Sequence, residues 1–232
     1  MSNVIDLLNR PMYGLLQTDR LLGLRPGTAR RWVDGYQRGG KQYEPFVRET
    51  STGEEIVTWG EFVETRLLSE YRDAGVPLIR MRPAVLRLRE ILQTRYPLAS
   101  AQTWLAVSGR ELVLRVQEEV GLEHRLALVV VRTGQTIWTA PAESFRRSIE
   151  WTGDDDDSQP RLIRPDRALS HVTIDPLRGF GEPVVRSVRT DTIGELFRAG
   201  ESPQDIATSY DLEPALVEQA IRYEMRRVRE AA

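Results

Sequence analysis

The sequence predicts an α+β protein that is mainly helical and consists of several small domains. Near both ends of the chain, apolar residues recur at helical spacing around a tight turn, which is typical of helix-turn-helix pairs. Between these ends, apolar residues alternate with polar ones beside glycine turns, which favours strands. The 232 residues, 41% hydrophobic and 28% charged, suffice for two or three small cores. We expect a winged helix-turn-helix domain with following helices at 1–97, a small strand-rich middle region at 98–151, an acidic, proline-containing linker at 152–171, and a helix-turn-helix domain of three helices at 172–232.

The composition leaves little material for catalysis. The chain has no cysteine and only two histidines, His124 and His171, so thiolate chemistry is excluded and imidazole chemistry has few candidates. No phosphate-binding glycine loop, nucleophile elbow or zinc-protease motif occurs. We therefore expect no enzyme, no cofactor and no metal. The absence of an apolar run of about 18 residues and of a secretory leader predicts a cytoplasmic protein without a membrane partner.

The net charge of −2 gives no general attraction for nucleic acid, so any such binding must come from local patches. Residues 1–100 contain 15 Lys and Arg against 12 Asp and Glu, whereas residues 101–232 contain 17 against 22. All but one of the basic residues are arginine, whose rigid fork suits phosphates and base edges. For the high ratio of arginine to lysine in the whole chain, we favour a bias in codon composition as the explanation.

The first helix pair is predicted within residues 13–36. Gly23 ends the first helix and Pro26 opens the second. The apolar positions of the pair are Leu15, Leu16, Leu21, Leu22, Ala29, Trp32 and Val33. We expect the polar side of the second helix and its surroundings to contact DNA through Arg25, Thr28, Arg30, Arg31 and Tyr36. The alternative is a solvated basic face. The run GLRPGTARRW at 23–32 resembles the DNA-binding end of MerR-type regulators, which implies a helix pair followed by a β wing.

The wing is predicted as a hairpin between residues 37 and 59. Phe46 and Val47 form the expected first strand, the Ser-Thr-Gly sequence at 51–53 the turn, and residues 56–59 the return strand. Lys41 and Arg48 are expected to contact phosphates from it. Four glutamates in the same segment would repel DNA, so a purely structural hairpin stays as an alternative.

Two further helices are predicted within residues 60–96, and the second carries five arginines: Arg80, Arg82, Arg87, Arg89 and Arg95. Three interpretations are open for these arginines. They form a row of phosphate-binding side chains (a rail for phosphates), a dimer surface paired with carboxylates, or a solvated face, and the solvated face is the simplest. In the middle region, alternation at 103–116 and the valine-rich run at 125–139 predict a small sheet. The four aspartates at 154–157 favour a hydrated, extended linker over a divalent-cation site, because the spacing of a calcium loop is absent.

The last sixty residues carry the clearest helix signals. Ser202 and Pro203 are typical of a helix start, and Pro214 opens the next helix after a turn at Asp211. The apolar positions of these helices are Ile206, Ala207, Tyr210, Leu216, Val217, Ala220, Ile221, Met225 and Val228. Glutamates make the last helix a poor surface for phosphate, so this pair favours protein contacts.

The motifs VTIDP, GFGEPVV, RTDTIGELFRAG and SPQDIATSYDL within residues 172–223 resemble the domain-of-unknown-function family seen in VapB-like antitoxins of VapBC toxin-antitoxin systems. This resemblance implies a PIN-domain ribonuclease toxin, encoded nearby, as the partner. It also implies an arginine-bearing segment that blocks the acidic site of the toxin. Arg226, Arg227 and Arg229 are the candidates, with Arg161 and Arg164 as rivals. The alternative is a tail that frays in solvent.

We therefore expect an antitoxin that neutralises a PIN-domain toxin and binds operator DNA to regulate its own operon. A homodimer is expected, because paired half-sites give one short helix enough affinity. The alternatives are a stand-alone MerR-like regulator that binds an effector or another protein, and a module that uses both helix pairs for protein contacts.

Overall fold

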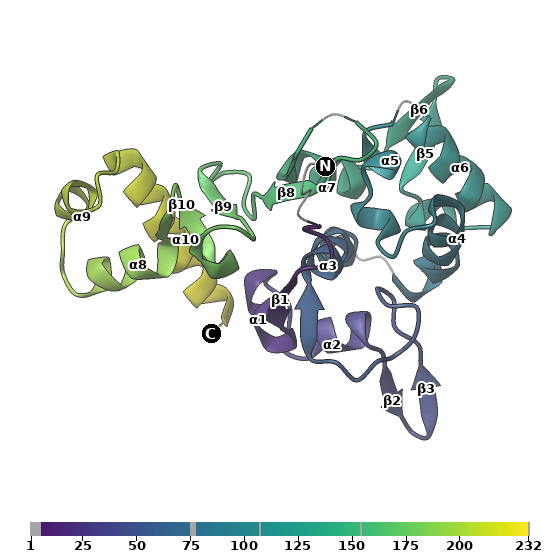
Figure 1. Ribbon diagram of the computed structural model, residues 1–232, viewed down its shortest axis with the longest axis horizontal. Coiled ribbons are helices and arrows are strands. Elements are labelled where there is room, and N and C mark those ends of the chain that lie inside the picture. The colour runs from purple at the N-terminus through teal and green to yellow at the C-terminus, as the bar shows by residue number, and fades with distance from the viewer. Residues whose placement is uncertain (1–5, 75–77, 107, 154, 232) are drawn as a thin grey trace. The chain divides into compact units, whose positions relative to one another are not determined.

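Figure 1 shows a computed structural model that describes residues 6–74, 78–106, 108–153 and 155–231. The chain divides into two compact units. Unit 1 comprises residues 1–147 and 151–160, and unit 2 comprises residues 148–150 and 161–232. Both units contain helices and strands, so the expected mixture of α and β structure is confirmed. No helix in the described ranges has the length and apolar character needed to cross a membrane.

Unit 1 begins with two helices and two pairs of short strands. Its first elements are β1 (Pro11–Gly14), α1 (Leu15–Leu21), α2 (Thr28–Val33), β2 (Tyr36–Arg38), β3 (Lys41–Tyr43) and β4 (Ile56–Thr58). Strand β1 pairs with β4, and β2 pairs with β3, both antiparallel. The predicted helix pair is present, with α2 starting two residues after Pro26. Of its expected apolar positions, Leu16 is exposed and Leu22 and Trp32 are half-buried, while the others are buried.

Helix α3 (Trp59–Asp73) forms the centre of unit 1 and is seen nearly end-on in Figure 1. Thr58 and Glu61 form a capping box at its start, so two of its first backbone donors are satisfied. Trp59, Phe62 and Tyr71 are among the largest fully buried side chains. The indole N–H of Trp59 donates to the carbonyl of Pro160 at 2.7 Å, which fixes residue 160 to the core of unit 1.

The remainder of unit 1 is a helical layer with one hairpin. Its elements are η1 (Leu78–Met81), α4 (Arg82–Leu92), η2 (Pro97–Ala99), α5 (Ala101–Trp104), α6 (Gly109–Glu119), η3 (His124–Leu126), β5 (Val129–Arg132), β6 (Gln135–Trp138) and α7 (Ala140–Ser148), which ends at the boundary with unit 2. The valine-rich hairpin is confirmed as β5 and β6. The strands predicted at 103–116 are wrong, because this stretch forms α5 and α6. In α6, Val113, Val116 and Gln117 are buried at helical spacing.

Unit 2 is built on an antiparallel sheet with the strand order β11, β10, β9, β8, β7. Its strands are β7 (Ile149–Trp151), β8 (Pro160–Ile163), β9 (Val172–Ile174), β10 (Pro183–Val185) and β11 (Val188–Arg189), with the turn η4 (Gly179–Gly181) between β9 and β10. The division between the units passes through β7 and β8. The prediction of an extended linker throughout 152–171 is wrong, because β8 lies within it and buries Leu162 and Ile163.

Three helices follow the sheet: α8 (Thr190–Arg198), α9 (Pro203–Ser209) and α10 (Pro214–Ala231). The predicted starts at Pro203 and Pro214 are confirmed, and the Ser202 hydroxyl accepts from the Asp205 N–H at 3.1 Å. Most of the predicted apolar positions are buried in one core, but Tyr210 and Met225 are exposed, and the Val228 side chain lies outside the described residues. Helix α10 continues to residue 231, so the arginine-bearing segment is part of this helix.

Candidate nucleic-acid interface

Asp19 joins the two helices of the N-terminal pair. Its carboxylate accepts hydrogen bonds from the backbone N–H groups of Gly27 and Ala29, both at 2.7 Å. Gly27 is the N-cap position of α2 and has no side chain to satisfy the first donors of that helix. Asp19 is only 3% exposed, so this carboxylate of α1 caps α2 from inside the protein. The pair is therefore held at a fixed angle by two charge-assisted hydrogen bonds.

Three predicted DNA-binding arginines lie on the exposed side of this pair. Arg25, Arg30 and Arg31 are exposed, and Arg25 makes no ion pair within the described part of the chain. Arg30 forms a salt bridge with Glu55. Arg31 donates to the hydroxyl of Thr28 at 3.1 Å. Thr28, also predicted to contact DNA, is buried and its hydroxyl accepts from Arg31, so the structure gives this side chain a role within the domain.

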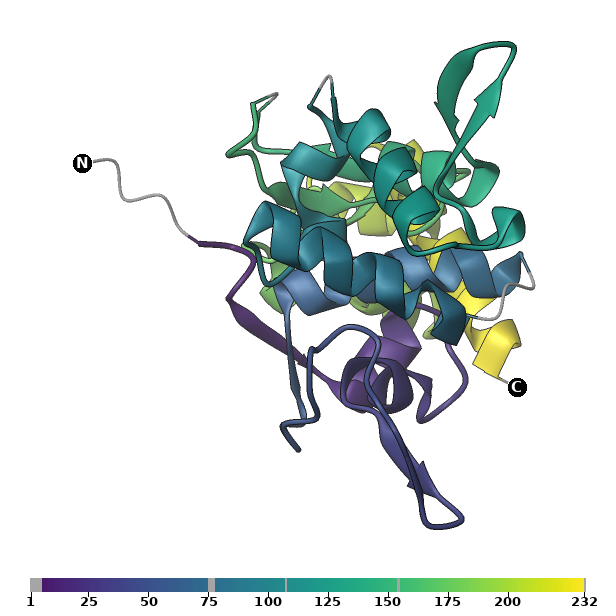
Figure 2. The same ribbon diagram turned by 90° about the vertical axis from the view of Figure 1, so that its right-hand side faces the viewer.

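The wing of the structure is the β2–β3 hairpin, which projects from unit 1 at the end opposite the β5–β6 hairpin (Figure 2). Tyr36 and Tyr43 are cross-strand partners whose rings stack at 4.6 Å with an interplanar angle of 2°. Lys41 lies over the ring of Tyr43 at 5.3 Å. Arg38 is exposed and has no ion-pair partner among the residues that the structure describes. The stretch 35–43 contains no acidic residue, so the only charges of the hairpin are those of Arg38 and Lys41.

A glycine is required at the base of this hairpin. Gly35 has φ 78°, and a Cβ at this position would lie 2.5 Å from the carbonyl oxygen of Tyr43. Phe46 and Val47 then donate from their backbone N–H groups to the carbonyl of Trp32 at 2.7 and 2.9 Å. The chain after the hairpin thus satisfies the C-terminal end of α2, and this fixes the hairpin beside the helix.

The predicted pairing of residues 46–47 with residues 56–59 is wrong. Residues 46 and 47 are in no strand, and β4 pairs with β1 instead. The hairpin turn lies at Gly39 and Gly40, ahead of the predicted Ser-Thr-Gly turn. The prediction that Arg48 contacts phosphate is also wrong, since Arg48 is only 5% exposed and its guanidinium faces the interior.

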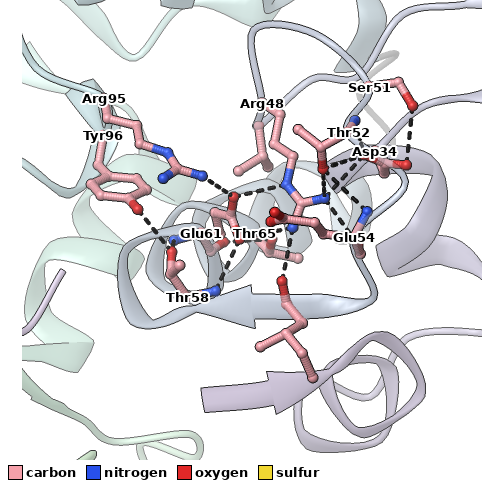
Figure 3. A network of polar contacts seen from close by, with 12 residues as sticks. Asp34, Arg48, Ser51, Thr52, Glu54, Thr58, Glu61, Thr65, Arg95 and Tyr96 are labelled. Atoms are coloured by element: carbon pink, nitrogen blue, oxygen red, sulfur yellow. Dashed lines mark hydrogen bonds and ion pairs between the residues drawn. The ribbon is translucent and has the colours of Figure 1, made fainter. Parts of the chain in front are cut away.

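Arg48 is the centre of a buried polar network (Figure 3). Its Nε and one terminal nitrogen donate to the carboxylate of Glu61 at 2.8 and 3.2 Å. The other terminal nitrogen donates to Asp34 at 3.0 Å and to the Thr52 hydroxyl at 2.7 Å. The carbonyls of Glu54 and Ile56 accept two more hydrogen bonds at 3.0 and 2.8 Å. Arg48 therefore connects the end of α2, the loop before β4 and the start of α3.

The charges in this network stabilise one another. Burial opposes ionisation of Asp34, but hydrogen bonds from the Thr52 N–H and from Arg48 outweigh burial, so the pKa of Asp34 lies below its usual value. Burial likewise opposes the charge of Arg48, yet its hydrogen bonds to Glu61 and Asp34 raise the pKa of Arg48. Glu61 also accepts from Arg95 at 3.1 Å. The network is thus an internal support for α2.

The arginines predicted along α4 serve the fold. Arg82 donates to the backbone carbonyls of Pro45 and Glu49 at 2.7 and 2.9 Å. Arg89 donates to the carbonyl of Val47 at 2.6 Å. The other three pair with carboxylates of the same chain: Arg80 with Glu123, Arg87 with Glu90 and Glu119, and Arg95 with Glu61. A free rail for phosphates is therefore absent from the described residues of α4.

The predicted toxin-binding arginines lie in unit 2. Arg226 forms a salt bridge with Asp166, and Arg227 pairs with Glu224 at 3.2 Å. The side chain of Arg229 lies outside the described residues. The rival arginines Arg161 and Arg164 are in or next to β8, and both pair with Glu150.

Sequence reasoning missed several residues that organise or extend these surfaces. Asp19 and Asp34 act through tertiary hydrogen bonds, which no local pattern predicts. Arg38 was missed although it flanks a Gly-Gly turn between two tyrosines, which is a recognisable hairpin signal. Phe180 is 91% exposed and has a φ of 55°, a strained conformation for a side chain of this size.

Known families match both ends of the chain. The family described as "Putative DNA-binding HTH domain" matches residues 11–85, which include α1, α2 and the β2–β3 hairpin. The family described as "Protein of unknown function (DUF433)" matches residues 172–223, from β9 into α10. A helix-turn-helix domain is therefore present in unit 1.

Relatives of similar length occur in Mycobacterium tuberculosis. "Uncharacterized protein Rv2308" is 38% identical over 231 residues, covering 95% of this chain and 93% of that protein. "Putative antitoxin VapB45" is 30% identical over 233 residues, covering 91% and 92%. The X-ray crystal structure of Rv2018 from the same organism has a TM-score of 0.71 and 28% identity, covering 91% of this chain and 97% of that one. The chain belongs to the family of Rv2308 and VapB45.

Proposed function

We propose that this protein is the antitoxin of a type II toxin-antitoxin system, and that it regulates its own operon by binding operator DNA through unit 1. The observation that carries the DNA-binding part is the exposure of four basic side chains, Arg25 and Arg31 in the helix pair and Arg38 and Lys41 in the hairpin. These side chains lie within a helix-turn-helix domain, whose second helix commonly enters the major groove. The protein acts by binding and is not an enzyme.

In this proposal the interface is MerR-like. The start of α2 faces base edges and phosphates through Arg30 and Arg31, while Arg38 and Lys41 contact the backbone from the hairpin. Tyr36 holds the hairpin in shape by stacking on Tyr43. Two copies form a homodimer that reads paired half-sites, because one helix of six residues offers few base contacts.

Glu55 competes with DNA for one of these arginines. Its carboxylate pairs with Arg30, and both side chains are largely exposed. A phosphate must displace this carboxylate before it binds Arg30. Replacing Glu55 by glutamine is therefore expected to raise DNA affinity, opposite in sign to the loss of an arginine.

The DNA-binding part is tested by fluorescence anisotropy with the fragment upstream of the protein's own gene. A scrambled fragment of the same length and base composition is the control. The proposal predicts that the upstream fragment binds at least about a thousandfold more tightly than the control. Equal affinity for the two fragments would refute operator recognition.

The antitoxin part is supported by the relative named VapB45 and by the match at residues 172–223. We propose that the neighbouring gene encodes a PIN-domain ribonuclease and that Arg226, Arg227 and Arg229 face its acidic site. The test is growth of a host that expresses the neighbouring gene with and without this protein, followed by co-purification. Arrest relieved by the wild type and not by the triple alanine variant is expected. Unchanged rescue by that variant refutes the arginine assignment, and a harmless neighbour refutes the antitoxin proposal.

The internal partners of Arg226 and Arg227 favour a second candidate, a stand-alone regulator without a toxin. Both arginines already neutralise carboxylates of unit 2, so their place in the fold has a structural explanation. Exposed aromatic side chains such as Phe180 often anchor protein partners. The second candidate predicts that the neighbouring gene is harmless and that Phe180→Ala weakens co-purification of another protein partner, whereas Arg226→Ala does not.

A further inference from the structure

A concave site lies in unit 1, away from the residues of the proposed DNA interface. It is a hollow of about 590 Å³, bounded by α5, α6, β6 and α7. Trp104, Leu105, Ile137 and Trp138 supply its apolar walls. The volume falls in the range of about 300–1,000 Å³ that small-molecule sites occupy. The site is thus large enough for one small organic ligand.

The aromatic wall is fixed in place. Trp104 is buried, and its indole N–H donates to the carbonyl of Leu98 at 2.7 Å. Its ring lies 4.6 Å from that of Trp138 and 4.9 Å from that of Phe145. Trp104 thus supports the ring of Trp138 from inside the protein, and the half-buried Trp138 ring supplies apolar surface to the hollow.

The walls formed by β6 and α7 are fixed to the central helix α3. The Tyr71 hydroxyl lies 2.9 Å from the Thr139 hydroxyl, and Thr139 directly follows Trp138. Ser144 on α7 donates to Glu70 at 2.8 Å, and Glu70 is also on α3. These contacts hold β6 and α7 against α3. The hollow is therefore largely formed before any ligand arrives.

The polar lining of the hollow is positive. Arg110 is exposed and has no hydrogen bond or ion pair within the described ranges of the chain. Arg146 holds the carboxylate of Glu143 through two contacts at 3.0 and 3.1 Å, and Arg147 shares that carboxylate at 2.6 Å. The single acidic group of the lining is thus neutralised, while Arg110 remains available to an anion.

We propose that this hollow is a binding site for a small organic anion with a flat apolar body, such as an aromatic carboxylate or sulfonate. The apolar body lies against Trp138, which Trp104 supports from inside, and the anionic group lies on Arg110. Neither feature is used by the DNA or toxin contacts proposed above.

The site also has a physical connection to the helix-turn-helix pair. Tyr71 and Glu70 are near the end of α3, whose first turn carries Glu61. Glu61 binds Arg48, which in turn holds Asp34 at the end of α2. A ligand that shifts Trp138 or α7 therefore acts on the support of α2. This coupling rests on the proposed DNA binding, whereas the ligand site itself does not.

The probe for the site is 8-anilinonaphthalene-1-sulfonate, with uncharged N-phenyl-1-naphthylamine as its matched analogue. Titration calorimetry of the wild type should give one saturable site per chain for the sulfonate. Arg110→Ala should weaken sulfonate binding about tenfold and leave the uncharged analogue unaffected. Arg115→Ala is the control, because Arg115 is an exposed arginine on the same helix outside the lining.

Trp138→Ala should weaken both probes, and equal urea midpoints for the arginine variants and the wild type establish that they are folded. Equal affinity of the Arg110→Ala and Arg115→Ala variants for the sulfonate, or binding that does not saturate at one site, overturns the proposal. In a separate arm, a saturating sulfonate should change the affinity of the wild type for the upstream DNA fragment but leave that of Arg110→Ala unchanged. An unchanged wild type refutes the coupling alone, and absence of all DNA binding refutes the proposed function alone.

Discussion

Replacement of Arg48 by methionine removes the charge at the centre of the network that supports α2. Arg48 makes six hydrogen bonds, three of them to the carboxylates of Asp34 and Glu61. Methionine fills a similar length of the interior but donates no hydrogen bond. Two carboxylates and two backbone carbonyls then lose their common partner.

The expected loss of stability depends on the hydrogen bonds that Asp34 and Glu61 keep in the variant. Removing one partner of a buried ion pair costs about 3–5 kcal/mol. Asp34 retains the backbone N–H groups of Thr52 and Gly53, and Glu61 retains Arg95 and the Thr58 N–H. We therefore expect the lower end, a loss of about 3 kcal/mol in the free energy of unfolding of unit 1.

The assay is urea unfolding followed by tryptophan fluorescence. Four of the five tryptophans lie well inside unit 1, and Trp151 lies in β7 at the boundary with unit 2, so this signal reports mainly on unit 1, while circular dichroism reports on both units. The double variant Arg48→Met/Glu61→Gln should lose less than the sum of the single losses, because glutamine removes the charge that methionine leaves unpaired. Unfolding of Arg48→Met within about 0.5 kcal/mol of the wild type, together with weaker DNA binding, would refute the reasoning and return Arg48 to the DNA surface.

Asp19→Ala leaves the first donors of α2 without a buried acceptor, so unit 1 should lose about 1–3 kcal/mol by urea unfolding; a loss below that range would contradict the capping role. Gly35→Ala should lower the free energy of unfolding of unit 1 by more than about 1 kcal/mol, because the new methyl group would lie against the Tyr43 carbonyl. Gly39→Ala is the control, since a methyl group there meets no atom within 4 Å, and it should destabilise unit 1 clearly less. Equal losses for the two variants would argue against a close approach at the base of the hairpin. Burial raises the pKa of Glu64 to about 8, so the folded protein holds a proton that the unfolded chain has already released, and stability should fall as pH rises from about 4.5 to 8. In the wild type, the free energy of unfolding should decrease by up to about 1.4 kcal/mol per pH unit in this range, and in Glu64→Gln this decrease should be smaller. An identical pH dependence in the variant would show that another group titrates.

Local signals in the sequence predicted the elements that depend on local energetics. The starts of α9 and α10 follow from Ser202, Pro203 and Pro214, because capping and proline geometry act within one turn. The short helices α1 and α2 and the β5–β6 hairpin were found for similar reasons. Helix α6 was missed because the run ELVLRV satisfies strand alternation, and only the packing of Val116 selects the helical spacing.

The site was predicted less completely, because it depends on contacts between distant residues. The exposure of the arginines and of Lys41 could be predicted, because charged side chains favour the surface and their positions in the helix pair and the hairpin are local features. The true wing was missed because the turn was predicted at the Ser-Thr-Gly sequence of 51–53, whereas the hairpin turns at Gly39 and Gly40. The interior position of Arg48 depends on Asp34 and Glu61, which lie 14 and 13 residues away in the sequence. No periodicity predicts such a pairing.

The most direct test of the DNA-binding account is the salt dependence of affinity for the upstream fragment. The double variant Arg25→Ala/Arg31→Ala is compared with Arg115→Ala/Arg132→Ala, which removes the same charge from α6 and the β5–β6 hairpin. If Arg25 and Arg31 each contact a phosphate, the negative slope of log affinity against log salt should become shallower by about two in the first variant. The slope should stay unchanged in the second variant. Equal slopes for both variants would contradict the assignment of DNA binding to the helix-turn-helix surface.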